Sequence, residues 1–96
     1  MAREIFVENL KAIRKSKGLT QVMLAELADL SSGLIGDIES GRRNPTLTTI
    51  EKIALALNVP VQQLFYDPEN SIPEDAYESR DELKKILHIL IDKAFE

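Results

Sequence analysis

The sequence predicts an all-α protein. Apolar residues recur at the spacings of three and four residues that one face of a helix requires, as Phe6, Leu10 and Ile13 do near the start of the chain. No segment alternates apolar and polar residues over the length of a strand, and no Asn-Gly or Asp-Gly pair marks a hairpin. The 96 residues suffice for one domain with a short appendage, and its thin core would gain stability from a second subunit.

Two helices are expected at the start of the chain. The first runs from about Glu4 to Lys17, and Gly18 ends it because glycine readily adopts the left-handed conformation. Thr20 is a suitable N-cap for a second helix over residues 21–28, since its hydroxyl can accept a hydrogen bond from an amide of the first turn. This second helix ends at Asp29.

A third helix and a basic loop are expected next. Ser31 or Ser32 caps this helix, which ends near Ser40 and Gly41. The loop that follows, residues 42–45, has the sequence Arg-Arg-Asn-Pro.

The fourth and fifth helices complete a domain over residues 1–66. The fourth covers residues 47–57, with Thr46 as its N-cap and Asn58 at its end. Pro60 can occupy the first turn of a short fifth helix that reaches Phe65, because the fixed φ of proline suits that position.

The net charge of −4 is unevenly distributed along the chain. Residues 1–66 carry eight basic and seven acidic side chains, whereas residues 67–96 carry four basic and nine acidic ones. Residues 67–75 combine prolines with acids and are expected to form an acidic linker. A nucleic-acid partner would respond to clusters of positive charge on one face, and Lys15 with Lys17 and Arg42 with Arg43 are the candidate clusters.

A C-terminal helix is expected within residues 76–96. Ser79 and Glu82 have the spacing of a capping box at its start. The apolar residues that follow recur at intervals of four, three and four, which is typical of a seam between two helices. We therefore expect this helix to dimerise, and packing back on its own domain is the alternative. The candidate dimerisation residues are Leu83, Ile86, Leu87, Leu90, Ile91 and Ala94.

The composition argues against an enzyme. The chain has one histidine, no cysteine and no glycine-rich phosphate loop, so no catalytic set can be assembled. His88 has no second ligand at a suitable spacing, so neither a metal site nor a cofactor is expected. No apolar run reaches the ~18 residues of a membrane span, and the N-terminus does not resemble a signal peptide. We expect a cytoplasmic protein without a membrane partner.

The segment from Thr20 to Gly41 is the most informative part of the sequence. Two short helices separated by about three residues cross at a steep angle, so the second one projects outward. Ala25 is small enough for the point of closest approach, and four apolar residues can brace the pair. These bracing residues are Leu24, Leu30, Ile35 and Ile38. The residues between the apolar positions of the second helix must then face outward, and they are Ser32, Gly33, Gly36 and Asp37. An outward helix of this width fits a DNA major groove, which is ~12 Å wide.

These features resemble the lambda-repressor-like, Cro-type helix-turn-helix family, also called the xenobiotic-response-element family. The resemblance covers roughly residues 5–66. The matching residues are Leu19-Thr20-Gln21, Leu24-Ala25, Ala28, Leu30-Ser31, Ile35, Ile38-Glu39, Gly41, Pro45, Leu47, Ile53-Ala54, Ala56-Leu57, Val59 and Leu64.

The resemblance implies a role for each residue of the DNA-binding site. Gln21 corresponds to a residue that binds a DNA phosphate, and Ser31 and Ser32 lie beside the DNA backbone at the start of the recognition helix. The positions that face the bases are Ser32, Gly33, Gly36 and Asp37, and the loop that follows the phosphates contains Arg42, Arg43 and Asn44. Arg14 and Glu39 correspond to an ion pair that ties the first helix to the recognition helix.

Two departures from the family pattern affect this interpretation. Asp29 stands where the family usually has glycine, and aspartate tolerates the positive φ expected there at modest cost. The base-facing positions lack Arg, Gln and Asn, the residues that make bidentate base contacts. Close approach of the backbone, phosphate contacts and DNA shape would then carry much of the recognition.

The sequence therefore predicts a sequence-selective DNA-binding transcriptional regulator. We expect a repressor or autoregulator that binds double-stranded DNA as a homodimer on a two-fold symmetric operator. The alternative is a protein-interaction module, such as an antitoxin whose C-terminal helix binds a partner protein.

Overall fold

Six helices and no strand are present in the described part of the chain, which confirms the all-α prediction. The computed structural model describes residues 2–67 and 79–95, without the side chains of Ala2, Arg80 and Ala94. The helices are α1 (Ala2–Ser16), α2 (Gln21–Ala28), α3 (Ser32–Glu39), α4 (Leu47–Leu57), α5 (Val61–Leu64) and α6 (Arg80–Ala94). Apart from Asp67, the predicted acidic linker lies outside the described residues, as do residues 76–78.

Side-chain caps define the start of four helices. The hydroxyl groups of Thr20, Ser31 and Thr46 each accept a hydrogen bond from the amide three residues later, at 3.1–3.2 Å. Ser79 makes the same contact with the amide of Glu82 at 3.1 Å, so the expected cap of the last helix forms. Satisfying amides that have no partner within the helix fixes where each helix begins.

Left-handed residues end α2 and α4. Asp29 and Asn58 both have a φ of 57°, and Gly18 and Gly41 turn the chain with φ of 70° and 80°. The prediction that Asp29 would adopt a positive φ in place of glycine is confirmed.

The predicted bounds of the first and fifth helices were slightly wrong, and each helix ends one residue earlier than expected. The first helix begins at Ala2, two residues before the expected start. Pro60 is the N-cap of α5 with extended backbone, and it therefore lies just outside the first turn. This position suits proline equally well, because an N-cap does not need an amide hydrogen for the helix ladder.

The core lies between the first five helices. Phe6 and Leu10 of α1 belong to one cluster with side chains of α2, α3, α4 and α5, and the core residues are almost entirely shielded from solvent. The other core side chains of these helices are Leu24, Ala25, Ile35, Ile38, Ile50, Ile53, Ala54, Leu57 and Leu64.

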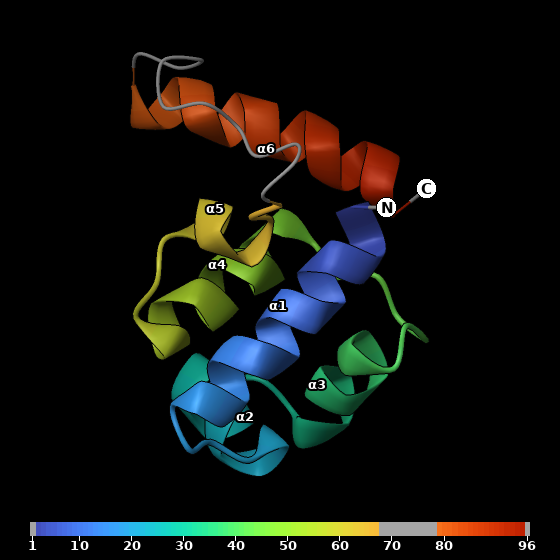
Figure 1. Cartoon of the computed structure of the whole chain (residues 1–96), viewed down its shortest axis with the longest axis vertical. Helices are drawn as coiled ribbons and strands as arrows, with labels where there is room; N and C mark the ends of the chain where they lie inside the picture. The colour runs from blue at the N-terminus through green and yellow to red at the C-terminus, as the bar shows by residue number, and fades with distance from the viewer. Residues whose placement is uncertain (1, 68–78, 96) are drawn as a thin grey trace.

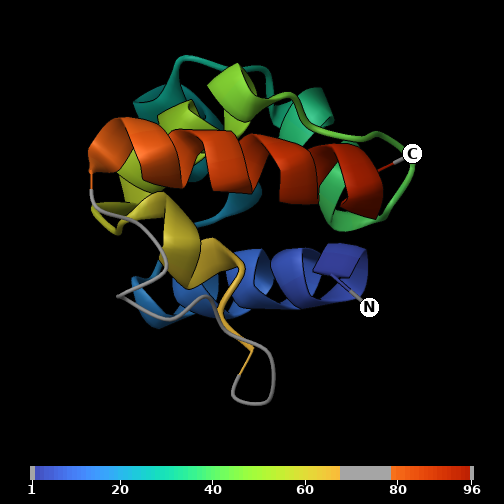
Figure 2. The ribbon, with the colours of Figure 1, turned by 90° about the horizontal axis from the view of Figure 1, so that it is seen from above.

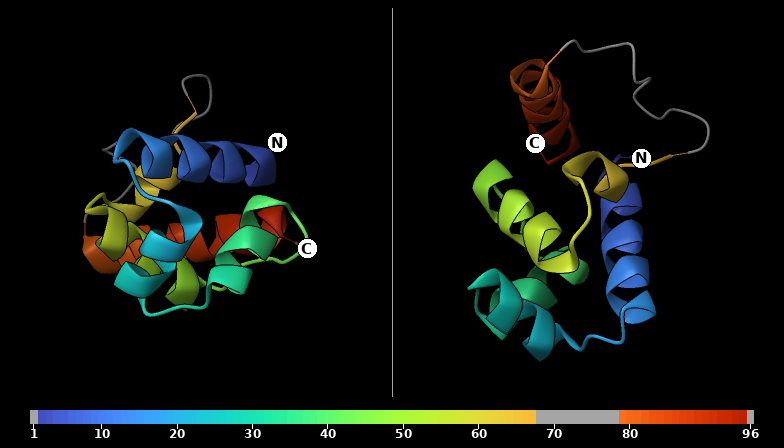
Figure 3. Two further views of the ribbon diagram at one scale, coloured as in Figure 1. Left: turned by 90° about the horizontal axis from the view of Figure 1, so that it is seen from below. Right: turned by 90° about the vertical axis from the view of Figure 1, so that its left-hand side faces the viewer.

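Helix α6 packs on the end of this bundle opposite α2, across α5 and the beginning of α1 (Figures 1 and 2). Ile91 joins the core, and Leu83 and Leu87 are buried as well. The ring of Phe95 meets the ring of Phe6 edge-on, with centroids 5.7 Å apart. The right-hand view of Figure 3 shows α2 and α3 at the opposite end of the bundle from α6.

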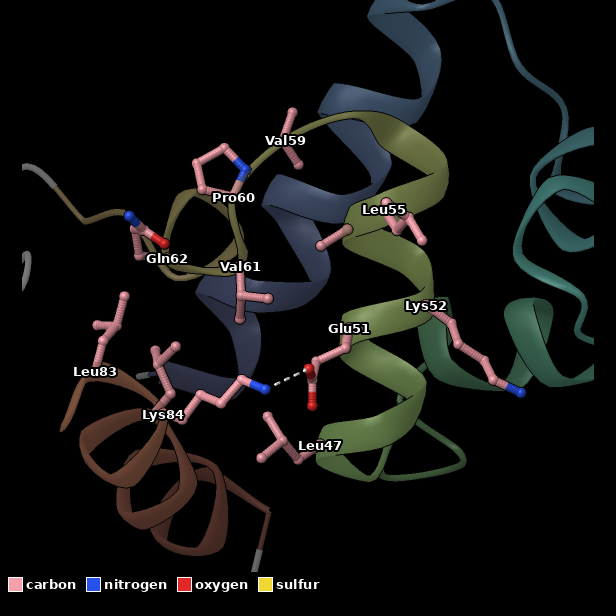
Figure 4. Close-up of a pocket in the computed structure, with 12 residues that line it drawn as sticks. Leu47, Glu51, Lys52, Leu55, Val59, Pro60, Val61, Gln62, Leu83 and Lys84 are labelled. Atoms are coloured by element: carbon pink, nitrogen blue, oxygen red, sulfur yellow. Dashed lines mark ion pairs between the residues drawn. The ribbon is translucent and has the colours of Figure 1, made fainter. Parts of the chain in front are cut away.

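A pocket remains between α4, α5 and the first half of α6 (Figure 4). At its edge Lys84 of α6 forms an ion pair with Glu51 of α4, at 3.3 Å between Nζ and Oε2. Both side chains are well exposed, so this pair contributes little to the free energy of unfolding.

In the structure α6 thus packs on its own domain, which was the alternative to dimerisation in the sequence analysis. Three of the six candidate dimerisation residues, Leu83, Leu87 and Ile91, face the chain's own domain. Ile86 and Leu90 are half-buried, and the side chain of Ala94 lies outside the described residues. The buried stripe has a spacing of four and four residues, which differs from the predicted seam. Dimerisation through this helix stays a prediction.

Candidate nucleic-acid interface

Helix α3 has a buried inner face and an open outer face. Ile35 and Ile38 are at most 1% exposed and hold the helix against α2 and α1. On the outer face Ser32 and Gly33 are exposed and Gly36 is half-buried. The polar or small residues that the sequence placed outward are therefore brought together on one surface.

The inner face is anchored by the ion pair expected between Arg14 and Glu39. Arg14 donates from Nε to Oε2 of Glu39 at 2.7 Å and from Nη2 to Oε1 at 3.0 Å. Its third nitrogen, Nη1, donates to the carbonyl oxygen of Leu19 at 2.8 Å. Both side chains are at least nine-tenths buried. The bidentate pair fixes the end of α3 relative to α1.

Gln21 is attached to the same network. Its Nε2 donates to Oε1 of Glu39 at 3.1 Å, so the amide at the start of α2 is held beside α3. A Cβ atom added to Gly36 would lie 3.4 Å from Oε1 of Gln21. The side-chain amide of Gln21 therefore lies beside Gly36 of α3.

Ser31 uses its hydroxyl to cap α3, whereas Ser32 begins the helix with an exposed side chain. Gly33 has open space around it, since an added Cβ would meet nothing within 4 Å. The start of α3 therefore exposes amides, a hydroxyl and bare backbone, and a helix N-terminus favours anions such as phosphate.

The basic loop is folded back on the end of α3. Oδ1 of Asp37 accepts from Nε of Arg42 at 3.1 Å and pairs with its Nη2 at 3.1 Å. The carbonyl oxygen of Asp37 accepts from the amides of Arg42 and Arg43 at 2.9 and 3.1 Å. Arg42 is therefore oriented by Asp37, which places its guanidinium beside the outer face of α3.

Further contacts connect the loop with both ends of the chain. Nδ2 of Asn44 donates to the carbonyl oxygen of Phe95 at 2.8 Å. Arg3 of α1 donates from Nη2 to the carbonyl oxygen of Gly41. Asn44, expected to follow the DNA phosphates, thus also joins the loop to the end of α6.

Sequence reasoning missed these partners. Asp37 and Arg42 are five residues apart and lie on either side of a helix end, and no helical spacing brings such residues together. Glycine at position 41, with its positive φ, was the available signal, because it turns the chain back toward Asp37. The contact between Asn44 and Phe95 spans 51 residues and has no local signal.

The described residues offer little for other kinds of site. They contain no group of three or more His, Asp or Glu side chains arranged to hold a metal ion. The expectation that His88 has no second ligand at a suitable spacing was wrong, because Asp92 lies one helical turn later, with its Oδ2 3.6 Å from Nε2 of His88. None of the described helices combines the length and hydrophobicity that a membrane crossing requires.

Known proteins share this arrangement. The helix-turn-helix family model HTH_3 matches residues 10–64. The immunity repressor protein of Bacillus phage phi105 is 44% identical over 77 residues, which are 78% of this chain and 53% of the repressor. This chain therefore spans about half the length of that relative. The control protein C.SmaI of Serratia marcescens is 40% identical over 63 residues, covering 66% of this chain and 75% of that protein.

A solved structure agrees with the sequence comparisons. The crystal structure of the restriction-modification controller protein C.AhdI from Aeromonas hydrophila is similar with a TM-score of 0.64 at 38% identity. The similarity covers 66% of this chain and 96% of that one. The family model matches more than half of the chain, over the helices that build the α2–α3 unit. The chain belongs to the HTH_3 family of helix-turn-helix proteins.

Proposed function

We propose that this chain is a DNA-binding transcriptional regulator that inserts the outer face of α3 into the major groove. The observation that carries the proposal is the contrast within α3: a buried ion pair and two isoleucines fix its inner face, while its outer face is open and borders a basic loop. The family and the phage immunity repressor among its relatives support the same role, and they favour repression.

Each site residue has a proposed contact. The candidates for phosphate contacts are Gln21, Ser31, Arg42, Arg43 and Asn44. The candidates for contacts with base edges or close approach to them are Ser32, Gly33, Gly36 and Asp37. Phosphate contacts position the protein and base contacts select the sequence, so variants of the two groups should behave differently.

The basic loop provides the first test. Replacing both Arg42 and Arg43 by alanine should weaken binding to the chain's own promoter DNA and also to random DNA. The log–log salt slope should flatten by about 0.9 for each lost phosphate contact. Fluorescence anisotropy at several salt concentrations measures this, and the double variant Lys84→Ala with Lys85→Ala in the first half of α6 controls for the loss of two positive charges. An unchanged salt slope in the double variant would exclude the loop from the interface.

We also propose that the regulator acts as a homodimer. A dimer places two recognition helices about one DNA turn apart, ~34 Å, and predicts a two-fold symmetric operator. Sparse base contacts in one half-site make the second half-site valuable, because linking two weak contacts raises apparent affinity by ~10²–10⁴. On α6, Leu90 and Ile86 are half-buried and Ile89 is 56% exposed, so this flank is available to a second copy.

The dimer is tested in the full chain, since removing α6 would also uncover the core at Phe6. Ile89→Lys places a charge on the exposed flank of α6 and should shift sedimentation toward the monomer. Leu27→Lys is the matched control, because Leu27 is 61% exposed on α2. If the wild type sediments as a monomer at tens of micromolar, or if both variants stay dimeric, α6 is not the interface.

The remaining assignments follow from this role. A transcriptional regulator works where the DNA is, so we place the chain in the cytoplasm and assign it no catalytic activity. The antitoxin alternative receives no support from the names of the relatives reported above.

A further inference from the structure

Asp37 is bound to the loop that follows α3 through both its backbone and its side chain. Its carbonyl oxygen accepts from the amides of Arg42 and Arg43 and from Oγ of Ser40, all at 2.9–3.1 Å. Its carboxylate accepts from Nε of Arg42 and pairs with Nη2, both at 3.1 Å through Oδ1. The Asp37 carboxylate therefore binds the Arg42 guanidinium, a cation that a DNA phosphate would also attract.

The pair is exposed and easily exchanged. The side chain of Arg42 is 70% exposed and that of Asp37 is 41% exposed. Exposed ion pairs contribute little, so water or a phosphate oxygen can replace the carboxylate at small cost. An arginine has five N–H donors in a fork that suits phosphate as well as carboxylate.

The carboxylate itself is badly placed for a DNA surface unless it finds a donor. Its charge is repelled by the phosphates on either side of a groove, and an unpaired polar group removed from water is unfavourable. In the major groove the donor that an aspartate can use is the N4 amino group of cytosine.

We propose that Asp37 is a specificity-determining residue that competes with DNA phosphate for Arg42 and accepts from a cytosine N4 amino group when Arg42 leaves. This inference rests on the proposed function, in which the outer face of α3 lies in the major groove. On random DNA, transfer of Arg42 to a phosphate leaves the carboxylate without a partner. On an operator with cytosine at the facing position, Arg42 exchanges Asp37 for a phosphate and Asp37 exchanges Arg42 for the cytosine amino group. Only that sequence therefore compensates Asp37 for the loss of Arg42.

Arg43 provides the internal comparison. It lies next to Arg42 in the same loop and is exposed, yet it has no carboxylate partner among the residues that the structure describes. Arg43 is therefore a constant source of positive charge, whereas the availability of Arg42 depends on what Asp37 meets.

Asp37→Asn in the full chain tests the competition. The variant keeps the size of the side chain and removes its charge. We expect binding to random duplex DNA to become about two- to fivefold tighter, the range of one exposed ion pair. The log–log salt slope should steepen by about 0.9, as one more phosphate contact forms. Asp81→Asn makes the same change of total charge in the first turn of α6, at the end of that helix away from Phe95 and the basic loop, and should leave both quantities unchanged.

A double-mutant cycle assigns the gain to Arg42. If Asp37 acts by holding that side chain, Asp37→Asn should gain affinity in the wild type and in Arg43→Ala, and lose most of this gain in Arg42→Ala. A gain that persists in full in Arg42→Ala would overturn the competition, because simple charge repulsion would then explain it. The competition would also be overturned if Asp37→Asn tightened binding neither in the wild type nor in Arg43→Ala, or if it weakened binding to random DNA.

Binding-site selection from a randomised duplex library tests the base contact. The wild type should select cytosine at one position in each half-site, and Asp37→Ala should lose the preference at that position alone. Asp37→Asn should replace it by adenine, the base that asparagine pairs with. Identical selected sites for all three proteins would exclude position 37 from base recognition. If the wild type binds no DNA in either assay, the proposed function itself fails, which is a different result.

Discussion

Two carboxylates of α3, two residues apart and on different faces, each pair with an arginine, and burial separates their roles. Glu39 is 3% exposed and binds Arg14 through both oxygens. Asp37 is 41% exposed and binds Arg42 through one oxygen. The chemistry of the two pairs is the same, but only the first is removed from water.

This difference decides what each pair can do. Breaking the buried pair leaves an uncompensated charge in the core, so the pair stays closed and fixes the orientation of α3. Breaking the exposed pair costs little because water replaces the lost partner. The inner pair therefore serves the architecture of the site, and the outer one is free to respond to a ligand.

Arg14→Met is expected to give the largest effect on stability. Methionine keeps much of the buried volume, but the Glu39 carboxylate loses its guanidinium and the Leu19 carbonyl loses a donor. We expect the free energy of unfolding to fall by about 3–5 kcal/mol. This is a large part of the ~5–15 kcal/mol that natural domains possess. Urea denaturation followed by circular dichroism measures the loss.

The double variant Arg14→Met with Glu39→Met is the control. Removing both charges together should recover part of the lost stability, since no carboxylate is then buried without a partner. If the single variant loses less than about 1 kcal/mol, the buried pair is as dispensable as an exposed one, and the comparison between the two faces breaks down.

Most of the fold could be predicted from local signals in the sequence. Hydroxyl side chains before apolar runs gave the starts of α2, α3, α4 and α6, and Asp29 and Asn58 gave two of the ends. The packing of α6 could not be predicted. An amphipathic helix needs an apolar partner, but its sequence does not say whether that partner is the same chain or a second one.

The candidate site also has one part that could be predicted from the sequence and one part that could not. The placement of Ser32, Gly33 and Gly36 on an open face followed from helical periodicity, and the pair of Arg14 and Glu39 followed from the family resemblance. The link between Asp37 and Arg42 depends on the path of the chain after a helix end. Such contacts are set by loop dihedral angles, which residue spacing alone does not reveal.

A second prediction extends the comparison of buried and exposed positions to α6. Leu87 is 2% exposed against the bundle, whereas Ile89, two residues later, is 56% exposed. Leu87→Ala should lower the free energy of unfolding by about 2–5 kcal/mol, the range of a large-to-small change in a core. Ile89→Ala should change it by less than about 0.5 kcal/mol at a protein concentration where the chain is monomeric. If urea denaturation shows equal losses of stability for Leu87→Ala and Ile89→Ala, the buried residues Leu83, Leu87 and Ile91 do not hold α6 on the domain.

A third prediction concerns the two glycines on the outer face of α3. Gly33→Ala should raise the free energy of unfolding by about 0.5–1 kcal/mol, because alanine favours a helix and the added methyl group meets nothing within 4 Å. Gly36→Ala should gain less, since its Cβ would touch Oε1 of Gln21 at 3.4 Å. Urea denaturation of both variants and the wild type under the same conditions compares the two changes in stability. A larger gain at position 36 than at position 33 would show that Gln21 moves aside freely and is not held by Glu39.

The smallest effect on stability is expected from Arg42→Ala, the counterpart of Arg14→Met on the other face. Its guanidinium is 70% exposed, so its loss leaves the Asp37 carboxylate in contact with water. We expect the free energy of unfolding to change by less than about 0.5 kcal/mol, and the change to shrink further at high salt, where exposed charges are screened. Asp37→Asn should give a change of the same small size, and the two should not add, because they remove one interaction. A loss above about 2 kcal/mol in Arg42→Ala would show that this pair supports the turn after α3, and burial would then no longer distinguish the two arginines.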